Sequence, residues 1–260
     1  MAAFACHPGF LRWAFAFALL LAADSCAQLA PAGESCGRPA SSADVLVFAR
    51  TAGFRHDSIP AGIAALQEVG AQAGYLIEAS EDPCALTETA LAHVRVVVFL
   101  NTSGTILQDE QRSALEKWLR AGGGFVGVHA AADTEYDWPF YGELLGTRFA
   151  SHPAIQTATI RVIDSQHPVT AALPAAWTRR DEWYDFRGQP AGAKVLGELD
   201  ESTYSGGQMG QHHPILWVHE SGSGRCVYFA GGHTAESYAE PLFRSVLLGA
   251  LRFASGDARP

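Results

Sequence analysis

Between residues 45 and 129 the chain alternates short apolar segments with helix-like segments, and this alternation restricts the fold more than any other feature. The apolar segments, each long enough for one strand, are residues 45–50 (VLVFAR), 75–79, 95–100 (RVVVFL) and 125–129 (FVGVH). The segments between them with helical character are residues 60–74, 86–93 and 109–120. Continuous apolar runs of this length are typical of strands buried on both faces of a parallel sheet. The strand–helix order therefore predicts a parallel sheet with helices on both faces.

The second half of the chain is less regular, but its pattern continues an α/β fold. We expect a short helix over residues 138–146, strands over 155–163, 194–199, 214–219 and 225–230, and a closing helix over 238–253. Hydrophobic residues make up 48% of the 260 residues and charged residues only 17%, so the chain can bury a substantial core. No repeat and no break in composition divides this region, and we expect a single domain over residues 44–256.

The first 27 residues have the pattern of a secretory signal peptide. Arg12 precedes an apolar run over residues 13–23 that is too short to span a bilayer, and small residues end at Ala27, where signal peptidase would cleave. A lipoprotein anchored through Cys26 is the alternative. Residues 28–43 are rich in Ala, Gly, Pro and Ser and are expected to form a flexible linker. The chain is therefore predicted to be periplasmic or secreted, without membrane contact once the signal peptide is removed.

Charge and cysteine content narrow the classes of partner and of chemistry. Lys and Arg total 18 and Asp and Glu total 27, and the net charge of −9 argues against a broad nucleic-acid-binding surface. Cys36 and Cys84 lie in loop-like sequence, and they are either a disulfide pair or two unrelated thiols. Cys226 lies in an apolar run and is expected to be a buried thiol. The sequence contains no C-x-x-C motif, which argues against thioredoxin-like redox chemistry.

Polar residues follow several predicted strands, at the edge where ligands bind in parallel α/β sheets. His56 follows the first strand, Asn101 follows the third, His129 ends the fourth, and His233 follows the last. If strands one, three and four are neighbours, as in a flavodoxin-like sheet, His56, residues 101–103 and His129 meet at one edge, and His233 would complete the site. Imidazole titrates near neutral pH, so the histidines are candidates for proton transfer. The structural alternatives are a core histidine at position 129 and helix-entry turns at positions 56 and 233.

The same histidines are candidate ligands of a divalent metal. The chain has ten histidines, and zinc-like ions favour imidazole combined with carboxylate, so His56, His129 and His233 form a candidate metal set. No HExxH or other closely spaced ligand motif occurs, and any such site would be assembled from distant loops. The absence of a GxSxG elbow argues against a serine hydrolase.

Aromatic and acidic residues gather in the irregular segments and favour a sugar ligand. Aromatic faces stack on the C–H surfaces of sugars, and carboxylates accept hydrogen bonds from sugar hydroxyls, although some of these rings would instead cap the core. The candidate catalytic residues are His56, His129, Asp181 and Glu182. The candidate substrate-binding residues are Asn101, Asp133, Tyr136, Trp138, His152, Trp183, Tyr184, His213, His233 and Glu236.

Five motifs occur in order along the chain: residues 53–59 (GFRHDSI), 122–146 (GGGFVGVHAAADTEYDWPFYGELLG), 149–153 (FASHP), 181–184 (DEWY) and 232–244 (GHTAESYAEPLFR). Together they resemble the ThuA-like (trehalose-utilisation) family over residues 44–254. The resemblance implies a flavodoxin-like three-layer α/β sandwich with a mainly parallel sheet, related to class I glutamine amidotransferases. Those enzymes carry a Cys nucleophile at the elbow after a central strand, whereas this chain has His129 there. The resemblance thus implies a role in sugar catabolism without glutamine hydrolysis.

The residues and the resemblance together favour a protein that acts on a small carbohydrate, with no nucleic-acid partner. The first hypothesis is an enzyme that acts on a disaccharide or a keto-sugar glycoside by hydrolysis, elimination or isomerisation. The alternatives are a non-catalytic sugar-binding module on an amidotransferase-like scaffold and a metal-binding structural protein. Histidines at strand ends favour the enzyme, and the absence of a complete catalytic signature favours the binding module. The sequence does not indicate an oligomeric state.

We predict that the mature protein begins at Gln28, because the short apolar run and the small residues before it suit signal peptidase. N-terminal sequencing of the exported protein measures this directly. A lipid-modified Cys26 at the N-terminus would contradict the prediction.

Overall fold

A nine-stranded sheet forms the centre of residues 36–258, the part of the chain described in the computed structural model. Its strands follow the order β2-β1-β3-β4-β11-β10-β9-β6-β7. The strand bounds are β1 Val45–Phe48, β2 Ile77–Ser80, β3 Val96–Leu100, β4 Gly124–Val128, β6 Gln156–Val162, β7 Ala176–Asp181, β9 Lys194–Asp200, β10 His213–Ser221 and β11 Gly224–Phe229. A separate two-stranded sheet pairs β5 (Phe149–Ser151) with β8 (Asp185–Phe186).

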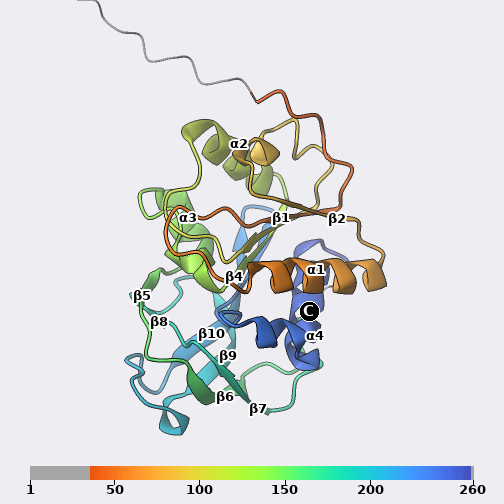
Figure 1. Ribbon diagram of the computed structural model, residues 1–260. Coiled ribbons are helices and arrows are strands. Elements are labelled where there is room, and N and C mark those ends of the chain that lie inside the picture. Colours follow the sequence, from red (N-terminus) through yellow and green to blue (C-terminus); the bar gives the residue numbers. More distant parts are fainter. Residues whose placement is uncertain (1–35, 259–260) are drawn as a thin grey trace, which may run out of the picture. The chain divides into compact units, whose positions relative to one another are not determined.

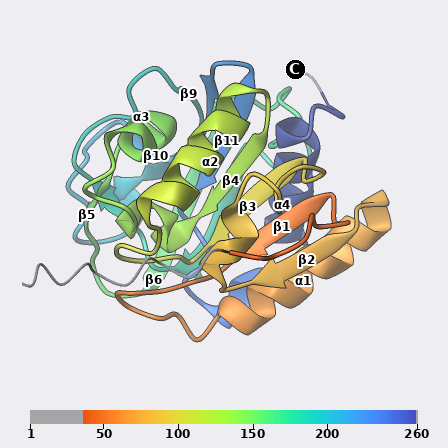
Figure 2. The same ribbon diagram turned by 90° about the horizontal axis from the view of Figure 1, so that it is seen from above.

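One half of the large sheet is parallel, and its central strands are fully buried. Strands β2, β1, β3, β4 and β11 run parallel and lie side by side in that order (Figure 2). Every residue of β1, β3 and β4 is buried, which explains why these strands appear in the sequence as continuous apolar runs. Helix α1 (Ile59–Ala73) connects β1 to β2, and helix α2 (Asp109–Arg120) connects β3 to β4. The predicted order, with the first, third and fourth strands as neighbours, is confirmed.

Helices cover both faces of this sheet (Figure 1). Helix α1 packs against the C-terminal helix α4 (Pro241–Ala254) on one face, and α2 lies with α3 (Pro139–Leu145) on the other. Helix α1 ends where predicted, at Gly74, whose φ of 81° is a left-handed conformation that glycine adopts without strain. The arrangement is the predicted three-layer α/β sandwich of the flavodoxin-like class.

The other half of the sheet is antiparallel. Strand β10 pairs with β11 and β9, and β6 pairs with β9 and β7. Strands β10 and β11 form a hairpin between the two strands predicted there, and Gly222 in its turn has a φ of 62°. This hairpin joins the two halves, because β11 is parallel to β4 on one side and antiparallel to β10 on the other.

Several parts of the secondary structure differ from the prediction, among them the short strands β5 and β8, which were not predicted. Residues 86–93, expected as a helix, form the end of a 3-10 segment (Pro83–Leu86) followed by turns. The Thr87 hydroxyl accepts the amide of Ala90, which gives that amide a partner outside the regular helix pattern. Strand β7 was not predicted, because its inward side chains include Arg179 and Asp181, and buried charges disguise the alternation of a half-buried strand.

The two cysteines with loop-like surroundings form a disulfide. Cys36 and Cys84 are bonded, with 5.2 Å between their Cα atoms, and Cys226 is a buried free thiol. Of the two alternatives for Cys36 and Cys84, the structure shows the pair. This bond fixes the start of the described chain to the segment that follows β2.

Residues 36–43, the part of the predicted linker that the structure describes, make several contacts with the domain. The predicted signal peptide and residues 28–35 of that linker lie outside the described residues. Residues 36–43 are anchored by the disulfide, by an ion pair between Arg38 and Glu78, and by the Ser41 hydroxyl, which donates to Glu78. No helix within residues 36–258 is long and apolar enough to cross a membrane.

We predict that the double variant Cys36→Ser/Cys84→Ser is less stable than the oxidised protein by about 4 kcal/mol, from the loop-closure entropy of a 48-residue separation. Denaturant unfolding of both proteins measures the difference. Reduced wild-type protein should behave like the variant, since both lack the same cross-link. Equal stability of the oxidised wild type and the variant would contradict this stabilising role.

Candidate functional site

Three histidines and one glutamate converge beyond the carboxyl ends of the parallel strands. His56 follows β1, His129 directly follows β4, His233 follows β11, and Glu182 follows β7. One ligand atom from each of these four residues, here called the central cluster, lies within 4.8 Å of the ligand atoms of the others. The structure thus brings together the three histidines predicted at strand ends and adds a carboxylate from the antiparallel half of the sheet.

His129 occupies the turn directly after β4 in a left-handed conformation with a φ of 49°. A non-glycine residue in this conformation is uncommon, and such strain gathers at functional sites. Its Nδ1 lies 2.7 Å from the carbonyl oxygen of Ala230, so this nitrogen carries the proton and donates it. Nε2 faces Glu182 and His233, so it donates to Glu182 when the imidazole is protonated and presents a lone pair when the imidazole is neutral. The Tyr184 ring covers the imidazole, with 4.2 Å between ring centroids.

The polar atoms of the central cluster lie close enough to share a cation. His129 Nε2 lies 3.3 Å from His233 Nδ1 and 3.4 Å from Glu182 Oε2, and His233 Nδ1 lies 3.1 Å from the same oxygen. Burial raises the pKa of Glu182, but hydrogen bonds from His129 and His233 outweigh burial and hold this pKa below its ordinary value. Burial lowers the pKa of His233, but Glu182 more than compensates and raises it overall. Glu182 is therefore an anion at neutral pH, balanced by a proton or a metal ion.

His56 differs from the other members because its Nδ1 is buried without a hydrogen-bond partner. Burial, reinforced by repulsion from His129 and His233, lowers the pKa of His56 to about 3. Its ring centroid lies 4.8 Å from that of His129 and 4.9 Å from that of His233. A buried neutral imidazole with an unused nitrogen is a preformed partner for a metal ion or a ligand hydroxyl.

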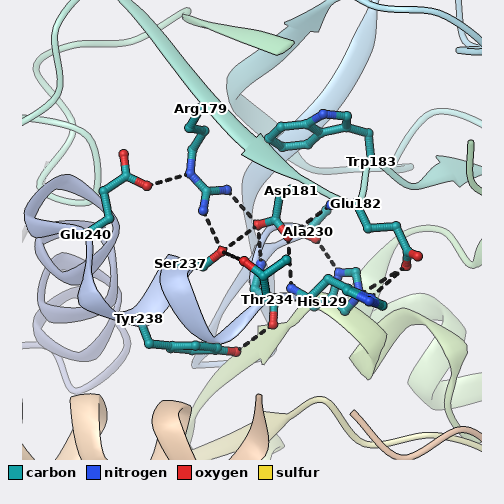
Figure 3. Close-up of polar contacts among 12 residues, drawn as sticks. His129, Arg179, Asp181, Glu182, Trp183, Ala230, Thr234, Ser237, Tyr238 and Glu240 are labelled. Carbon is teal, nitrogen blue, oxygen red and sulfur yellow. Dashed lines mark hydrogen bonds and ion pairs between the residues drawn. The ribbon is translucent and has the colours of Figure 1, made fainter. Parts of the chain in front are cut away.

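Asp181 lies between Arg179 and Glu182 (Figure 3) and positions two members of the central cluster. Its Oδ1 accepts the backbone amides of Glu182 and His233 at 3.0 and 3.1 Å. Its Oδ2 accepts the amide of Gly232 at 2.8 Å and the guanidinium of Arg179 at 2.6 Å. Burial raises the pKa of Asp181, but Arg179 and these hydrogen bonds lower it overall, so the carboxylate is ionised. Both oxygens are already bonded, so Asp181 is a positioning residue rather than the catalytic group that sequence analysis suggested.

The central cluster borders a cleft of about 430 Å³, a size typical of small-molecule sites. The residues that line it are Phe54, His56, Asp133, Phe149, His152, Glu182, Tyr184 and His233. Phe54 is 64% exposed, and its ring lies nearly parallel to that of His233. His152 Nδ1 lies 3.0 Å from Glu182 Oε1. The cleft thus combines aromatic walls with imidazole and carboxylate groups.

Two further predicted residues support the cleft without being part of the central cluster. Asp133 lines the cleft, and the Tyr136 hydroxyl donates to its Oδ1 at 2.7 Å. Burial, followed by the hydrogen bond to Asp133, raises the pKa of Tyr136, so this hydroxyl keeps its proton and remains a donor. Tyr136 therefore orients the Asp133 carboxylate toward the cleft.

Three predicted substrate-binding residues have structural roles instead. Asn101 is fully buried, and its amide donates to the Ser58 hydroxyl at 2.9 Å. Trp138 is buried and stacks on Tyr141. Trp183 is fully buried, and its indole N–H donates to a backbone carbonyl. These aromatic side chains stabilise the core, which was the alternative considered for them.

His213 and Glu236 also lie away from the lining of the cleft. His213 is buried, with Nε2 2.8 Å from the carbonyl oxygen of Tyr184, and Glu236 is exposed. Conversely, sequence analysis did not select Phe54 and Phe149 as site residues. Phe54 carried one usable signal, its place between a strand end and His56, whereas Phe149 lies in the unpredicted three-residue strand β5.

Fold and site together define a flavodoxin-like α/β protein with a histidine at the elbow after a central strand. The chain belongs to the ThuA family, described as trehalose utilisation, whose model matches residues 44–254. No curated protein matches the chain.

Solved structures of ThuA-like proteins share this fold. One from Bacteroides uniformis is 23% identical, with a TM-score of 0.68 over 84% of this chain and 95% of its own. Another from Parabacteroides merdae is 19% identical, with a TM-score of 0.69 over 85% of this chain and 91% of its own. A β-galactosidase from Bacillus circulans sp. alkalophilus matches over 83% of this chain but 31% of its own, at 16% identity and a TM-score of 0.54. These likenesses show a common fold.

We predict that in metal-free protein His129→Ala destabilises the fold more than His56→Ala, by about 1–3 kcal/mol. Both changes remove one buried imidazole, but only the loss of His129 leaves a buried carbonyl, that of Ala230, without this donor. Denaturant unfolding in the presence of a chelator compares the two variants, and the cavity cost is similar in both. An equal or larger loss for His56→Ala would contradict the assigned hydrogen bonding.

Proposed function

We propose that this chain is an exported enzyme that acts on a neutral carbohydrate, a disaccharide or a keto-sugar glycoside, by hydrolysis, elimination or isomerisation. The observation that carries the proposal is the convergence of His56, His129, His233 and Glu182 beside an aromatic-sided cleft. Membership of the ThuA family supports a carbohydrate-related role. The disulfide supports a periplasmic or secreted location, because such bonds persist in oxidising compartments.

A divalent, zinc-like metal fits the donor atoms of the central cluster. Three imidazoles and one carboxylate are the ligand types that such ions favour. His129 donates its other ring N–H to the Ala230 carbonyl, the outer-shell contact that orients metal-binding histidines. His56 keeps an unpartnered nitrogen and remains neutral. A metal held here would act as a Lewis acid toward a carbonyl or hydroxyl oxygen of the sugar.

Other groups of the cleft are placed to bind the sugar and to move a proton. Phe54 and Phe149 offer aromatic faces for sugar C–H surfaces. Asp133, oriented by Tyr136, can accept a sugar hydroxyl. The His152 side chain is exposed and its Nδ1 lies 3.0 Å from Glu182 Oε1, so the imidazole is placed to exchange a proton between the cleft and this carboxylate. The cleft thus combines groups suited to binding a sugar with a group suited to proton transfer.

The elbow residue makes glutamine hydrolysis through a Cys nucleophile incompatible with this site. His129 occupies that position, and the free cysteine of the described chain, Cys226, is buried within β11. The same observation favours a second candidate function, a non-catalytic sugar-binding module. In that case the exposed ring of Phe54 and the Asp133 carboxylate would bind the sugar while the central cluster serves only stability.

We expect Glu182→Gln to lower turnover of an accepted sugar by about 10–100-fold, the usual effect of altering a metal-site carboxylate or its outer-shell partner. The amide has no charge to balance His233 and is a poor metal ligand. The assay measures turnover of disaccharides and their keto forms with zinc, manganese or no added metal. The matched control is Glu236→Gln, which changes the same group at an exposed position outside the cleft lining and should retain wild-type turnover.

The outcomes separate the two candidate functions. Unchanged turnover in Glu182→Gln would contradict a catalytic role for the central cluster. Sugar binding without turnover under every metal condition would support the binding module. If the protein neither binds nor turns over any of these sugars, the proposed substrate class is contradicted.

A further inference from the structure

A second group of metal-ligating side chains lies outside the cleft lining. It consists of Asp185 in β8, Glu201 at the start of the 3-10 segment Glu201–Thr203, and His213 at the start of β10. One ligand atom from each lies within 4.8 Å of the other two. This second cluster has no part in the function proposed above.

Asp185 supplies an observation that points to a missing partner. The residue is only 2% exposed, and its Oδ1 accepts the backbone amide of Gln208 at 2.8 Å. Its Oδ2 is buried and has no hydrogen-bond partner. A buried carboxylate oxygen without a donor is costly, because it has lost its hydrogen bonds to water and no protein group replaces them. Asp185 also offers one carboxylate oxygen to the second cluster.

The second ring nitrogen of His213, Nδ1, faces Glu201. Its Nε2 lies 2.8 Å from the Tyr184 carbonyl oxygen, which can only accept, so Nε2 carries a proton. Its Nδ1 lies 2.8 Å from Glu201 Oε1 and 3.0 Å from the Tyr204 hydroxyl. The Tyr204 hydroxyl has one proton and can donate to one acceptor. His213 Nδ1 and Glu201 Oε1 are both acceptors, and at 2.8 Å they need a cation or a further proton between them.

Glu201 is held rigidly in place by the loop that follows it. Its Oε1 accepts the backbone amides of Met209 and Gly210 at 2.8 and 2.9 Å. The loop passes so close that a Cβ at Gly207 would lie 2.7 Å from Glu201 Cδ. The chain thus fixes the carboxylate before any ligand arrives, as preorganised metal sites do.

The charges of the second cluster do not balance without a cation. Two carboxylates face one imidazole, and within residues 36–258 the only ion pair of either carboxylate joins Glu201 to His213. A proton on His213 Nδ1 would satisfy Glu201 but leave Asp185 Oδ2 without a partner. A divalent cation would satisfy all three groups at once, since buried charges are stable when they are paired or coordinate a metal.

We propose that Asp185, Glu201 and His213 bind a structural divalent cation of the zinc class. One imidazole with two carboxylates is a zinc-type donor set, whereas calcium requires a shell made of oxygen atoms. The ion would tie β8 to the loop over residues 201–213. Because Asp185 follows Tyr184, and His213 holds the Tyr184 carbonyl, the ion also fixes the residue that covers His129 in the cleft.

Zinc stoichiometry tests this proposal separately from the central cluster. Purified protein is stripped with a chelator, saturated with zinc and measured by elemental analysis and calorimetry. Asp185→Asn should lose one zinc per chain relative to the wild type, together with the part of the zinc-dependent rise in thermal midpoint that this ion supplies. Glu182→Gln, in the central cluster, should keep the zinc of the second cluster and that part of the rise, and any zinc that it loses belongs to the central cluster. The matched control Asp137→Asn changes an exposed carboxylate and should match the wild type.

Two results would overturn the proposal. One is that Asp185→Asn binds as much zinc as the wild type. This result overturns the proposal even if the variant has a higher thermal midpoint because an unpaired buried charge has been removed. The other is the absence of an anomalous peak between Asp185, Glu201 and His213 in zinc-soaked wild-type crystals. This second test uses no variant, so a folding defect cannot affect it. A peak there, with loss of zinc in Asp185→Asn only, would establish the second site even if the central cluster binds no metal.

Discussion

The buried carboxylate of Asp181 is the interaction on which the candidate site depends. It lies at the end of β7, the last strand in the sheet order, yet it hydrogen-bonds the segment after β11, a central strand. Arg179 balances its charge, and its amide partners include those of Glu182 and His233. Two residues distant in sequence are thereby fixed side by side. Losing one partner of a buried ion pair costs about 3–5 kcal/mol, so site geometry and fold stability are inseparable at this point.

The turns after the two central strands explain why the cluster forms at this edge. His129 after β4 and Asn101 after β3 are both left-handed, with a φ of 49°. Each chain therefore turns sharply where its strand ends, and the side chains stay near the sheet edge. Asn101 donates to Ser58 beside α1, which secures the turn that carries His56. In amidotransferases the residue at this elbow is a cysteine nucleophile. In this chain it is His129, whose imidazole is held by the Ala230 carbonyl, an arrangement that suits a fixed ligand or base.

The sequence predicted the strands whose buried side chains are apolar and missed the strand whose buried side chains are charged. The parallel strands were predicted because their residues are apolar on both faces, and the strand order then placed His56, His129 and His233 together. Strand β7 was missed because its core contacts are charged, and with it the positioning role of Asp181. Residue type alone could not separate a ring that lines the cleft, such as Tyr184, from buried rings such as Trp183, because both lie in one motif and only packing distinguishes them.

Tyr184 connects the two clusters through different parts of the same residue. Its ring covers His129, with 4.2 Å between centroids, and its carbonyl oxygen lies 2.8 Å from His213 Nε2. It precedes β8, a strand of two residues whose pairing with β5 includes a register irregularity, so the local ladder supplies little rigidity. The wall of the cleft must then be held from outside that ladder. The hydrogen bond from His213 to the Tyr184 carbonyl is one such contact, and a cation held by Asp185, Glu201 and His213, as proposed above, would add a second.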